Sequence, residues 1–240
     1  MSMNKNIWII CIFFIILLLA GCTEQPTEKD PNEFIITTAD EVNITAVYSE
    51  TNQATQAVLL LHMLGKDKND YNNLSLYLQQ NSFSVLAIDF RGHGNSDLDY
   101  TKFTDEDWQN LVVDVEAGVD FLESKGYKRI AIVGASIGAN AGFKQAVQDT
   151  RIDSLVLLSA GESYQGINIT GIALYYDRPV LIVAAMDDKE AAVAATRIYN
   201  ALENPYIDLK MYPTGGHGTE MLQNQEGLAA TIVTWLQGTY

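Results

Sequence analysis

The sequence is poor in cysteine, and its two cysteines, Cys11 and Cys22, lie in the first 22 of 240 residues. The remainder of the chain therefore holds no disulfide, no metal site built on thiolates and no cysteine nucleophile. Histidine is nearly as scarce, since His62, His93 and His217 are the only three. Chemistry that needs an imidazole must use one of them.

Basic side chains are also few. The chain has 15 lysines and arginines against 30 aspartates and glutamates, which gives a formal net charge of −15 and an isoelectric point near 4.4. Because a nucleic-acid ligand needs its phosphates neutralised, we expect no nucleic-acid partner. The charge is typical of a solvated surface. Hydrophobic residues make up 48% of the chain, enough for one substantial core, so we expect a single folded domain.

One long apolar run is present, from Ile7 to Leu19, after the positive charge of Lys5. It is shorter than the about 20 residues that a membrane-spanning helix needs, but it has the length of the apolar region of a signal peptide. The residues Leu19-Ala-Gly-Cys22 resemble the lipobox of bacterial and archaeal lipoproteins. The resemblance implies that residues 1–21 are a signal peptide and that Cys22 is lipidated and becomes the first mature residue.

Either a lipidated Cys22 or the alternative, an uncleaved N-terminal anchor, would attach the protein to the cell membrane with its domain outside the cytoplasm. Residues 22–33 are polar, contain two prolines and have no apolar periodicity. This composition predicts a flexible linker, so the folded domain is expected to occupy residues 34–240.

Strand and helix patterns alternate through this domain. Strands are predicted over Phe34–Thr38, Val42–Tyr48, Ala57–His62, Phe83–Phe90, Ile130–Gly134, Ser154–Ser159, Val180–Ala184 and Ile207–Tyr212, the first two as an antiparallel pair. Helices are predicted over Asp70–Gln80, Asp105–Lys125, Ala139–Val147, Ala191–Leu202 and Thr219–Gln237. Most of the later strands are continuous apolar runs, which is typical of strands buried on both faces. The pattern therefore predicts an α/β fold with a mainly parallel sheet and helices on both faces.

The segment Gly134-Ala-Ser136-Ile-Gly138 stands between a predicted strand and a predicted helix. A Gly-x-Ser-x-Gly segment in this position is the pattern of a nucleophile elbow, a turn so tight that the residues two positions away from the serine must be small. The turn presents the serine hydroxyl at a helix N-terminus, where backbone N–H groups favour developing negative charge. Ser136 is therefore the candidate nucleophile.

A serine hydroxyl needs a base to remove its proton, and the base needs an acid to orient it. His217 lies in a glycine-rich loop directly after the last predicted strand, at the same edge of the sheet as Ser136, which makes it the candidate base. Asp187 and Asp188 follow the preceding predicted strand. One of the two carboxylates could cap the next helix while the other orients the histidine.

Together these segments resemble the α/β-hydrolase family over nearly all of residues 34–240. The matching segments come in the family's order: His62-Met-Leu-Gly65, Asp89-Phe-Arg-Gly-His-Gly-Asn-Ser96, Gly134–Gly138, Asp188 and Gly216-His-Gly218. The resemblance implies the α/β-hydrolase fold, with a central sheet of about eight strands, and a triad in the chain order serine, aspartate, histidine. In this triad Ser136 is the nucleophile and His217 is the general base and then acid. Asp188, the second aspartate of the pair, is favoured over Asp187 as the orienting acid.

The resemblance also implies an oxyanion hole. Its donors would be the backbone N–H of Ile137, directly after the nucleophile, and that of Leu64, two residues past His62. Relatives commonly have His-Gly in this loop, whereas this chain has His62-Met63, so Met63 is the rival of Leu64 as the second donor. His62 and the turn Arg91–Gly94 are expected to support loops and not to take part in catalysis.

Many relatives insert a helical lid before the strand Val180–Ala184, but here only Gly161–Arg178 is available. This segment is too short for a full cap domain. We therefore expect an open site that needs no oil–water interface and prefers esters of short acyl chains. The tyrosines of the segment, Tyr164, Tyr175 and Tyr176, are expected either to line a shallow pocket or to cover the sheet edge.

The sequence thus predicts a membrane-anchored serine hydrolase that cleaves carboxylic esters of small molecules or lipids through an acyl-enzyme. No group of histidine, cysteine and carboxylate residues has the spacing of metal ligands, so we expect no metal and no organic cofactor. The same fold could instead house a peptidase or other amide hydrolase, or support a cofactor-free haloperoxidase-like side activity. A non-catalytic binding lipoprotein is the alternative from a different class.

Overall fold

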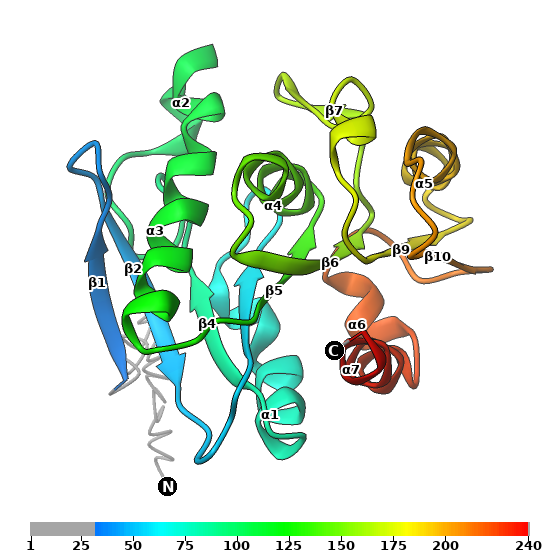
Figure 1. Ribbon diagram of the computed structural model, residues 1–240. Coiled ribbons are helices and arrows are strands. Elements are labelled where there is room, and N and C mark those ends of the chain that lie inside the picture. The colour runs from blue at the N-terminus through cyan, green and yellow to red at the C-terminus, as the bar shows by residue number, and fades with distance from the viewer. Residues whose placement is uncertain (1–31, 240) are drawn as a thin grey trace, which may run out of the picture.

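A computed structural model describes residues 32–239 and contains an eight-stranded sheet with helices on both faces (Figure 1). The strands lie in the order β1-β2-β4-β3-β5-β6-β9-β10. Pairs β1–β2 and β2–β4 are antiparallel, and the pairs from β4 to β10 are parallel. The strands span Glu33–Thr37 (β1), Asn43–Ser49 (β2), Ala57–Leu61 (β3), Ser84–Ile88 (β4), Ile130–Ala135 (β5), Ile152–Leu158 (β6), Val180–Ala185 (β9) and Ile207–Tyr212 (β10). The predicted fold and its antiparallel opening pair are therefore confirmed.

Seven α-helices belong to the described residues: Asn72–Gln80 (α1), Asp105–Gln109 (α2), Leu111–Ser124 (α3), Ile137–Gln148 (α4), Lys189–Ala201 (α5), Glu220–Asn224 (α6) and Leu228–Gly238 (α7). Two helices predicted as continuous are broken. The first divides at Asn110 (φ −75°, ψ −2°), which is both the last capping residue of α2 and the first capping residue of α3. The second divides before α7 because Gly227 has the left-handed φ of 83°. None of the helices within residues 32–239 is long and apolar enough to cross a membrane.

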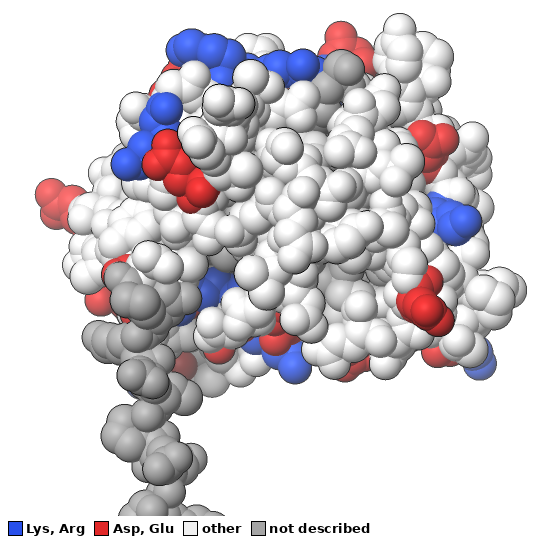
Figure 2. All heavy atoms as spheres, turned by 90° about the horizontal axis from the view of Figure 1, so that it is seen from below, with Lys and Arg blue, Asp and Glu red and all other residues white. Residues whose placement is uncertain are grey.

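Helices α3, α4 and α5 cover one face of the sheet, and α1 and α7 cover the other. Helices α1 and α7 contain no lysine, arginine, aspartate or glutamate. The molecule seen from below accordingly has a broad central area without charged side chains (Figure 2). This area contrasts with the net charge of −15 for the whole chain.

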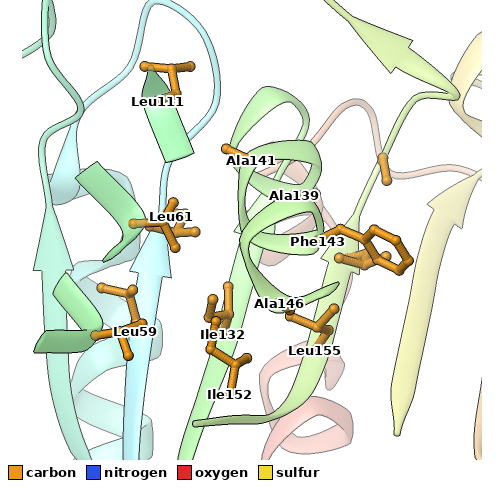
Figure 3. Packing of buried hydrophobic residues seen from close by; sticks show 14 of the residues in the cluster. Leu59, Leu61, Leu111, Ile132, Ala139, Ala141, Phe143, Ala146, Ile152 and Leu155 are labelled. Carbon is orange, nitrogen blue, oxygen red and sulfur yellow. The ribbon is translucent and has the colours of Figure 1, made fainter. Parts of the chain in front are cut away.

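Two hydrophobic clusters fill the space on the two sides of the sheet. Along β3, Leu59 and Leu61 point to the α3–α5 side, whereas Val58 and Leu60 point to the α1–α7 side. Figure 3 shows both residues in the first cluster; Leu61 lies against Gly142 of α4 and Leu59 against Gly118 of α3. All residues of β3 are fully buried, which explains why this strand has no polar residue in its sequence.

Ion pairs join the loop after β4 to the loop after β3, to the turn after β1 and to α3. The buried Lys68 donates to Asp89 through both its backbone N–H (2.7 Å) and its Nζ (2.8 Å). The buried Arg91 binds the carboxylates of Asp114 and Asp40. The Arg91 guanidinium lowers the pKa of Asp40 to about 2. These contacts hold the loops at the carboxyl ends of the strands, where the predicted site residues lie.

A two-stranded hairpin occupies the place of a lid. It consists of β7 (Ser163–Tyr164) and β8 (Ile167–Asn168), and sequence patterns did not predict it. The predicted signal peptide, the lipid site at Cys22 and most of the predicted linker lie outside the described residues. The first strand begins at Glu33, one residue before the predicted start of the domain.

Candidate active site

The predicted nucleophile lies on a strained turn between β5 and α4. Ser136 has φ 52° and ψ −120°, a conformation that few residues other than glycine adopt. Its N–H donates to the carbonyl oxygen of Leu158 at the end of β6 (2.8 Å). The side chain therefore stands at the N-terminus of α4, as the elbow pattern predicts.

The two glycines of the elbow are required by close backbone contacts. A Cβ atom on Gly134 would lie 2.6 Å from the carbonyl oxygen of Gly138. A Cβ atom on Gly138 would collide with the backbone carbonyl oxygens of Leu61 and His62 at the end of β3. The first turn of α4 thus packs directly against two strands, and only a residue without a side chain fits at these positions.

His217 meets Asp188 at the carboxyl ends of the last two strands. Its Nδ1 atom lies 2.5 Å from Oδ2 of Asp188. The other oxygen of Asp188 accepts a hydrogen bond from a backbone N–H in the first turn of α5 (3.3 Å). Asp188 therefore both contacts the histidine and caps the helix, whereas we expected the two aspartates to share these tasks.

Asp187 holds the loop that carries the histidine. Its carboxylate accepts hydrogen bonds from the N–H groups of Gly215 (3.0 Å) and Gly216 (3.3 Å). These hydrogen bonds lower the pKa of Asp187. The side chain turns toward the loop backbone, so the geometry separates the roles of the two neighbouring acids.

Two further side chains fix the histidine loop. The carboxylate of Glu220 accepts from the backbone N–H of His217 (3.1 Å), and the hydroxyl of Ser159 accepts from the N–H of Gly218 (2.9 Å). Our reading of the sequence did not identify either residue. Glu220 is the first residue of α6, and an acidic residue in the first turn of a helix is favoured by the helix dipole, which is a weak signal for Glu220. Ser159 carries no comparable signal.

Ser136 and His217 open into the same pocket, of about 300 Å³. Its walls include both predicted oxyanion residues, Leu64 and Ile137, and their rival Met63. Tyr164, Gln165 and Glu220 complete the lining. Four of the five predicted catalytic and oxyanion residues thus line one cavity, and Asp188 stands behind His217.

The loop after β3 contains Met63 and Leu64, the two candidates for the second oxyanion donor, and the N–H of Leu64 points away from the groups that bind the Met63 carbonyl oxygen. The carbonyl oxygen of Met63 accepts from the N–H of Lys66 (3.2 Å) and lies 2.8 Å from Nδ1 of His62. Because the peptide bond is trans, the N–H of Leu64 points in the opposite direction from this carbonyl. Ile137 opens α4, so its N–H has no acceptor within the helix.

His62 supports this loop. Its Nε2 atom accepts from the backbone N–H of Phe90 (2.9 Å), and the ring is fully buried. Burial lowers the pKa of His62 to about 4, so the ring is neutral at pH 7. His93, in the predicted loop turn, stacks on Tyr100 at 4.3 Å between ring centroids. Both histidines lie where we expected structural residues.

The three tyrosines of the short lid segment have three different environments. Tyr164 lines the pocket, with its ring edge-on to His217 at 6.2 Å. Burial and the nearby carboxylate of Asp188 raise the pKa of Tyr164. Tyr176 is buried in the core, and Tyr175 is 66% exposed. Only Tyr164 is therefore placed to touch a substrate.

A buried amide fixes the hairpin that carries Tyr164. Asn140 lies in α4, and its Nδ2 donates to the carbonyl oxygens of Gly161 (3.0 Å) and Ile167 (2.8 Å). Its Oδ1 accepts from the N–H of Gly161 (3.1 Å). The helix that begins at the nucleophile thus also anchors the cover of the pocket. Within residues 32–239, no group of three or more histidine, cysteine or carboxylate side chains could hold a metal ion.

Parts of this chain are similar to known proteins. An uncharacterized protein of Mycobacterium tuberculosis is 32% identical over 114 residues, which cover 47% of this chain and 31% of that protein. A carboxylesterase of Bacillus subtilis is 35% identical over 83 residues, which cover 35% of this chain and 32% of that protein. The chain therefore matches about a third of the length of these curated relatives.

A solved structure extends the likeness to the fold. The esterase Pf2001 of Pyrococcus furiosus superposes with a TM-score of 0.75 and 20% identity, covering 86% of this chain and 91% of that one. The family model described as serine aminopeptidase, S33, matches residues 52–174, which include the elbow and end before Asp188 and His217. Because this match spans more than half of the chain, the protein belongs to the serine aminopeptidase S33 family of α/β-hydrolases.

Proposed function

We propose that this protein is a serine hydrolase that cleaves carboxylic esters through an acyl-enzyme. Ser136 is the nucleophile, His217 the base and Asp188 the orienting acid. The observation that carries the proposal is the 2.5 Å contact of His217 with Asp188 beside a pocket that His217 shares with the elbow serine.

In acylation, Nε2 of His217 takes the Ser136 hydroxyl proton as the serine oxygen attacks the ester carbonyl carbon. Asp188 keeps the Nδ1 proton on the side away from the serine and stabilises the imidazolium that forms. The tetrahedral intermediate then collapses, and His217 passes its proton to the departing alcohol. Water attacks the acyl-enzyme in the second half-reaction, with His217 again as base, and releases the carboxylic acid and free Ser136.

The negative charge on the carbonyl oxygen is received by the N–H groups of Ile137 and Leu64. The opposite orientation of the Met63 carbonyl, held by His62, supports Leu64 over Met63 as the second donor. The α4 N-terminus adds its dipole at the same point. Each such donor is worth about 3 kcal/mol of barrier lowering in comparable enzymes.

The pocket supports a small acyl group. Its volume of about 300 Å³ and its apolar walls at Met63, Leu64 and Ile137 suit a short chain. The hairpin covers the site in place of a lid, so access needs no interfacial opening. The carboxylesterase named among the relatives supports an ester as the scissile bond, and the family's description as a serine aminopeptidase makes an amide the second candidate.

Membrane attachment through a lipid on Cys22 is part of the proposal. Residues Leu19-Ala-Gly-Cys22 support it. Replacing Cys22 by Ser should release active protein from the membrane fraction. If the variant stays in that fraction, an uncleaved anchor holds the protein instead.

The reaction is tested with p-nitrophenyl esters of increasing acyl length and with the matching anilides. We expect a burst of p-nitrophenol, a mass increase equal to the acyl group minus one hydrogen on the peptide that contains Ser136, and highest kcat/KM for short chains. Higher kcat/KM on the anilides would make the protein an amidase. Best turnover on emulsified long-chain esters would overturn the assignment of the pocket to short acyl groups.

A further inference from the structure

Strand β10 is the free edge of the central sheet. Among residues 32–239 it pairs with β9 alone and ends the strand order at the side opposite β1. The carbonyl oxygens of Tyr206 and Tyr212 accept from N–H groups at the two ends of β9 (2.9 and 2.8 Å). Because backbone groups alternate in direction along a strand, the residues with N–H and C=O directed outward are the odd-numbered ones: Ile207, Leu209 and Met211.

Two opposite charges lie on the same face of this edge. Asp208 and Lys210 are exposed and face α7. Asp208 accepts from Nε1 of Trp235 (2.7 Å), and Nζ of Lys210 lies 5.6 Å from the ring centroid of Tyr212. Neither charge has an ion-pair partner in the part of the chain that the structure describes.

These charges make the edge complementary to itself. If two β10 strands pair antiparallel, the outward backbone groups require that odd-numbered residues face odd-numbered ones. A two-fold axis at Leu209 then sets Asp208 of each copy opposite Lys210 of the other, at the closely spaced non-hydrogen-bonded positions. An axis at Asp208 or at Lys210 would instead oppose like charges. Charge complementarity therefore selects the register centred on Leu209.

Both sides of the edge are hollowed and offer apolar surface. On the α7 side, a hollow of about 550 Å³ is lined by β10 and by α7 residues that include Ala230 and Trp235. On the α5 side, a hollow of about 590 Å³ is lined by Met186, Val193 and Met211 among others, and Met186 and Val193 are 61% and 52% exposed. Since α7 carries no charged residue, it adds no repulsion between two copies of a strongly acidic chain.

We propose that two copies of this protein form a symmetric dimer by antiparallel pairing of β10, with the two-fold axis at Leu209. The central sheet then continues from one copy into the other. Reciprocal Asp208–Lys210 pairs fix the register, and the two hollows receive side chains of the partner. None of the residues in this interface belongs to the triad or the oxyanion hole, so the dimer does not depend on the proposed reaction.

Sedimentation velocity of the full-length chain, in a nonionic detergent that disperses its N-terminal segment, tests the proposal. The wild type should sediment as a dimer. Asp208→Lys and Lys210→Asp should each sediment as a monomer at the same concentration. Each variant places like charges opposite each other at both of the Asp208–Lys210 pairs. An equimolar mixture of these two variants should form a dimer again, since both pairs between the two different copies then join opposite charges. Lys128→Asp, which reverses a lysine that is 78% exposed elsewhere, is the matched control and should stay dimeric.

A monomeric wild type would overturn the proposal. Lys210 would then be a charge that prevents the β10 edge from pairing with another chain. Dimers that survive both reversals, or a mixture that stays monomeric, would also overturn it. If Asp208→Lys fails to fold for loss of the Trp235 contact, Leu209→Pro replaces it. Proline at this position removes an outward N–H and spares the bonds to β9, so the variant should fold as a monomer; a folded dimer would contradict the proposed register.

Discussion

The Nδ1 atom of His217 lies 2.5 Å from Oδ2 of Asp188, while the preceding residue, Asp187, directs its carboxylate to the backbone of the histidine loop. Adjacent acids thus have separate tasks. One can orient and stabilise an imidazolium, and the other fixes the loop that carries the imidazole. This difference can be measured, because removing each charge should lower kcat by a different factor.

Asp188→Asn should lower kcat by about 10⁴, because the amide stabilises the wrong histidine tautomer. Asp187→Asn should lower kcat by no more than about tenfold, because it weakens two hydrogen bonds to a loop without touching the imidazole. Steady-state kinetics on a short-chain ester, with thermal unfolding as the control for folding, compares the two. Equal losses of kcat would contradict the assignment of the acid.

Gly138→Ala should destabilise the fold by at least about 2 kcal/mol, because the added methyl group collides with two carbonyl oxygens of rigid backbone. Gly238→Ala is the matched control: apart from its neighbours in the chain and the backbone of its own helix, no atom lies within 4 Å of the new Cβ, and we expect a change within about 1 kcal/mol. Urea unfolding gives both values. A Gly138 variant as stable as wild type would mean that the elbow does not pack on β3 as described.

Asn140→Ala should cost about 3 kcal/mol, because it leaves the N–H of Gly161 and two buried carbonyl oxygens without their partner. Hydrogen exchange should then quicken in residues 161–168. Gln148→Ala, an exposed glutamine on the same helix, should change neither property. Unchanged exchange in the Asn140 variant would show that the hairpin is held by other contacts.

Stability should fall as the pH drops from 7 toward 4. The pKa of His62 is about 4 in the folded protein, mainly through burial, against 6.5 for the unfolded chain. The folded state therefore binds fewer protons in this range, and His62 contributes a loss of about 3 kcal/mol. Burial also lowers the pKa of His93 and acts in the same direction.

Urea unfolding between pH 7 and 5 measures this dependence above the range in which most carboxylates titrate. The NMR signal of the His62 ring should not titrate above pH 5. Burial raises the pKa of Asp114 to about 6, so protonation of this carboxylate opposes part of the loss in the same interval. A His62 signal that titrates near pH 6.5 would contradict the buried neutral ring.

The sequence predicted the parts of the site that depend on local chain geometry. The glycine spacing around Ser136 reflects contacts of the elbow itself, and the continuous apolar strands reflect a sheet covered on both faces. His217 and Asp188 were found because parallel strands bring their carboxyl ends to one edge. The register of β10 against β9 and the contact between these two side chains come from the structure alone.

Other parts depend on contacts between distant segments and left no local pattern. Asn140 looks like an ordinary helix residue until the hairpin at Gly161 surrounds its amide. Ser159 meets the N–H of Gly218, 59 residues later in the chain. The separate tasks of Asp187 and Asp188 were undecided for the same reason, because only the path of the histidine loop distinguishes two adjacent carboxylates.

The most direct test of the central claim is labelling by a fluorophosphonate probe, which reacts only with an activated serine. Wild-type protein should be labelled on the peptide that contains Ser136, and Ser136→Ala should not be labelled. Ser163→Ala, which removes an exposed serine of the hairpin, should be labelled like the wild type. A folded wild-type protein that fails to react, or a Ser136→Ala variant that reacts as fast as the wild type, would contradict the triad.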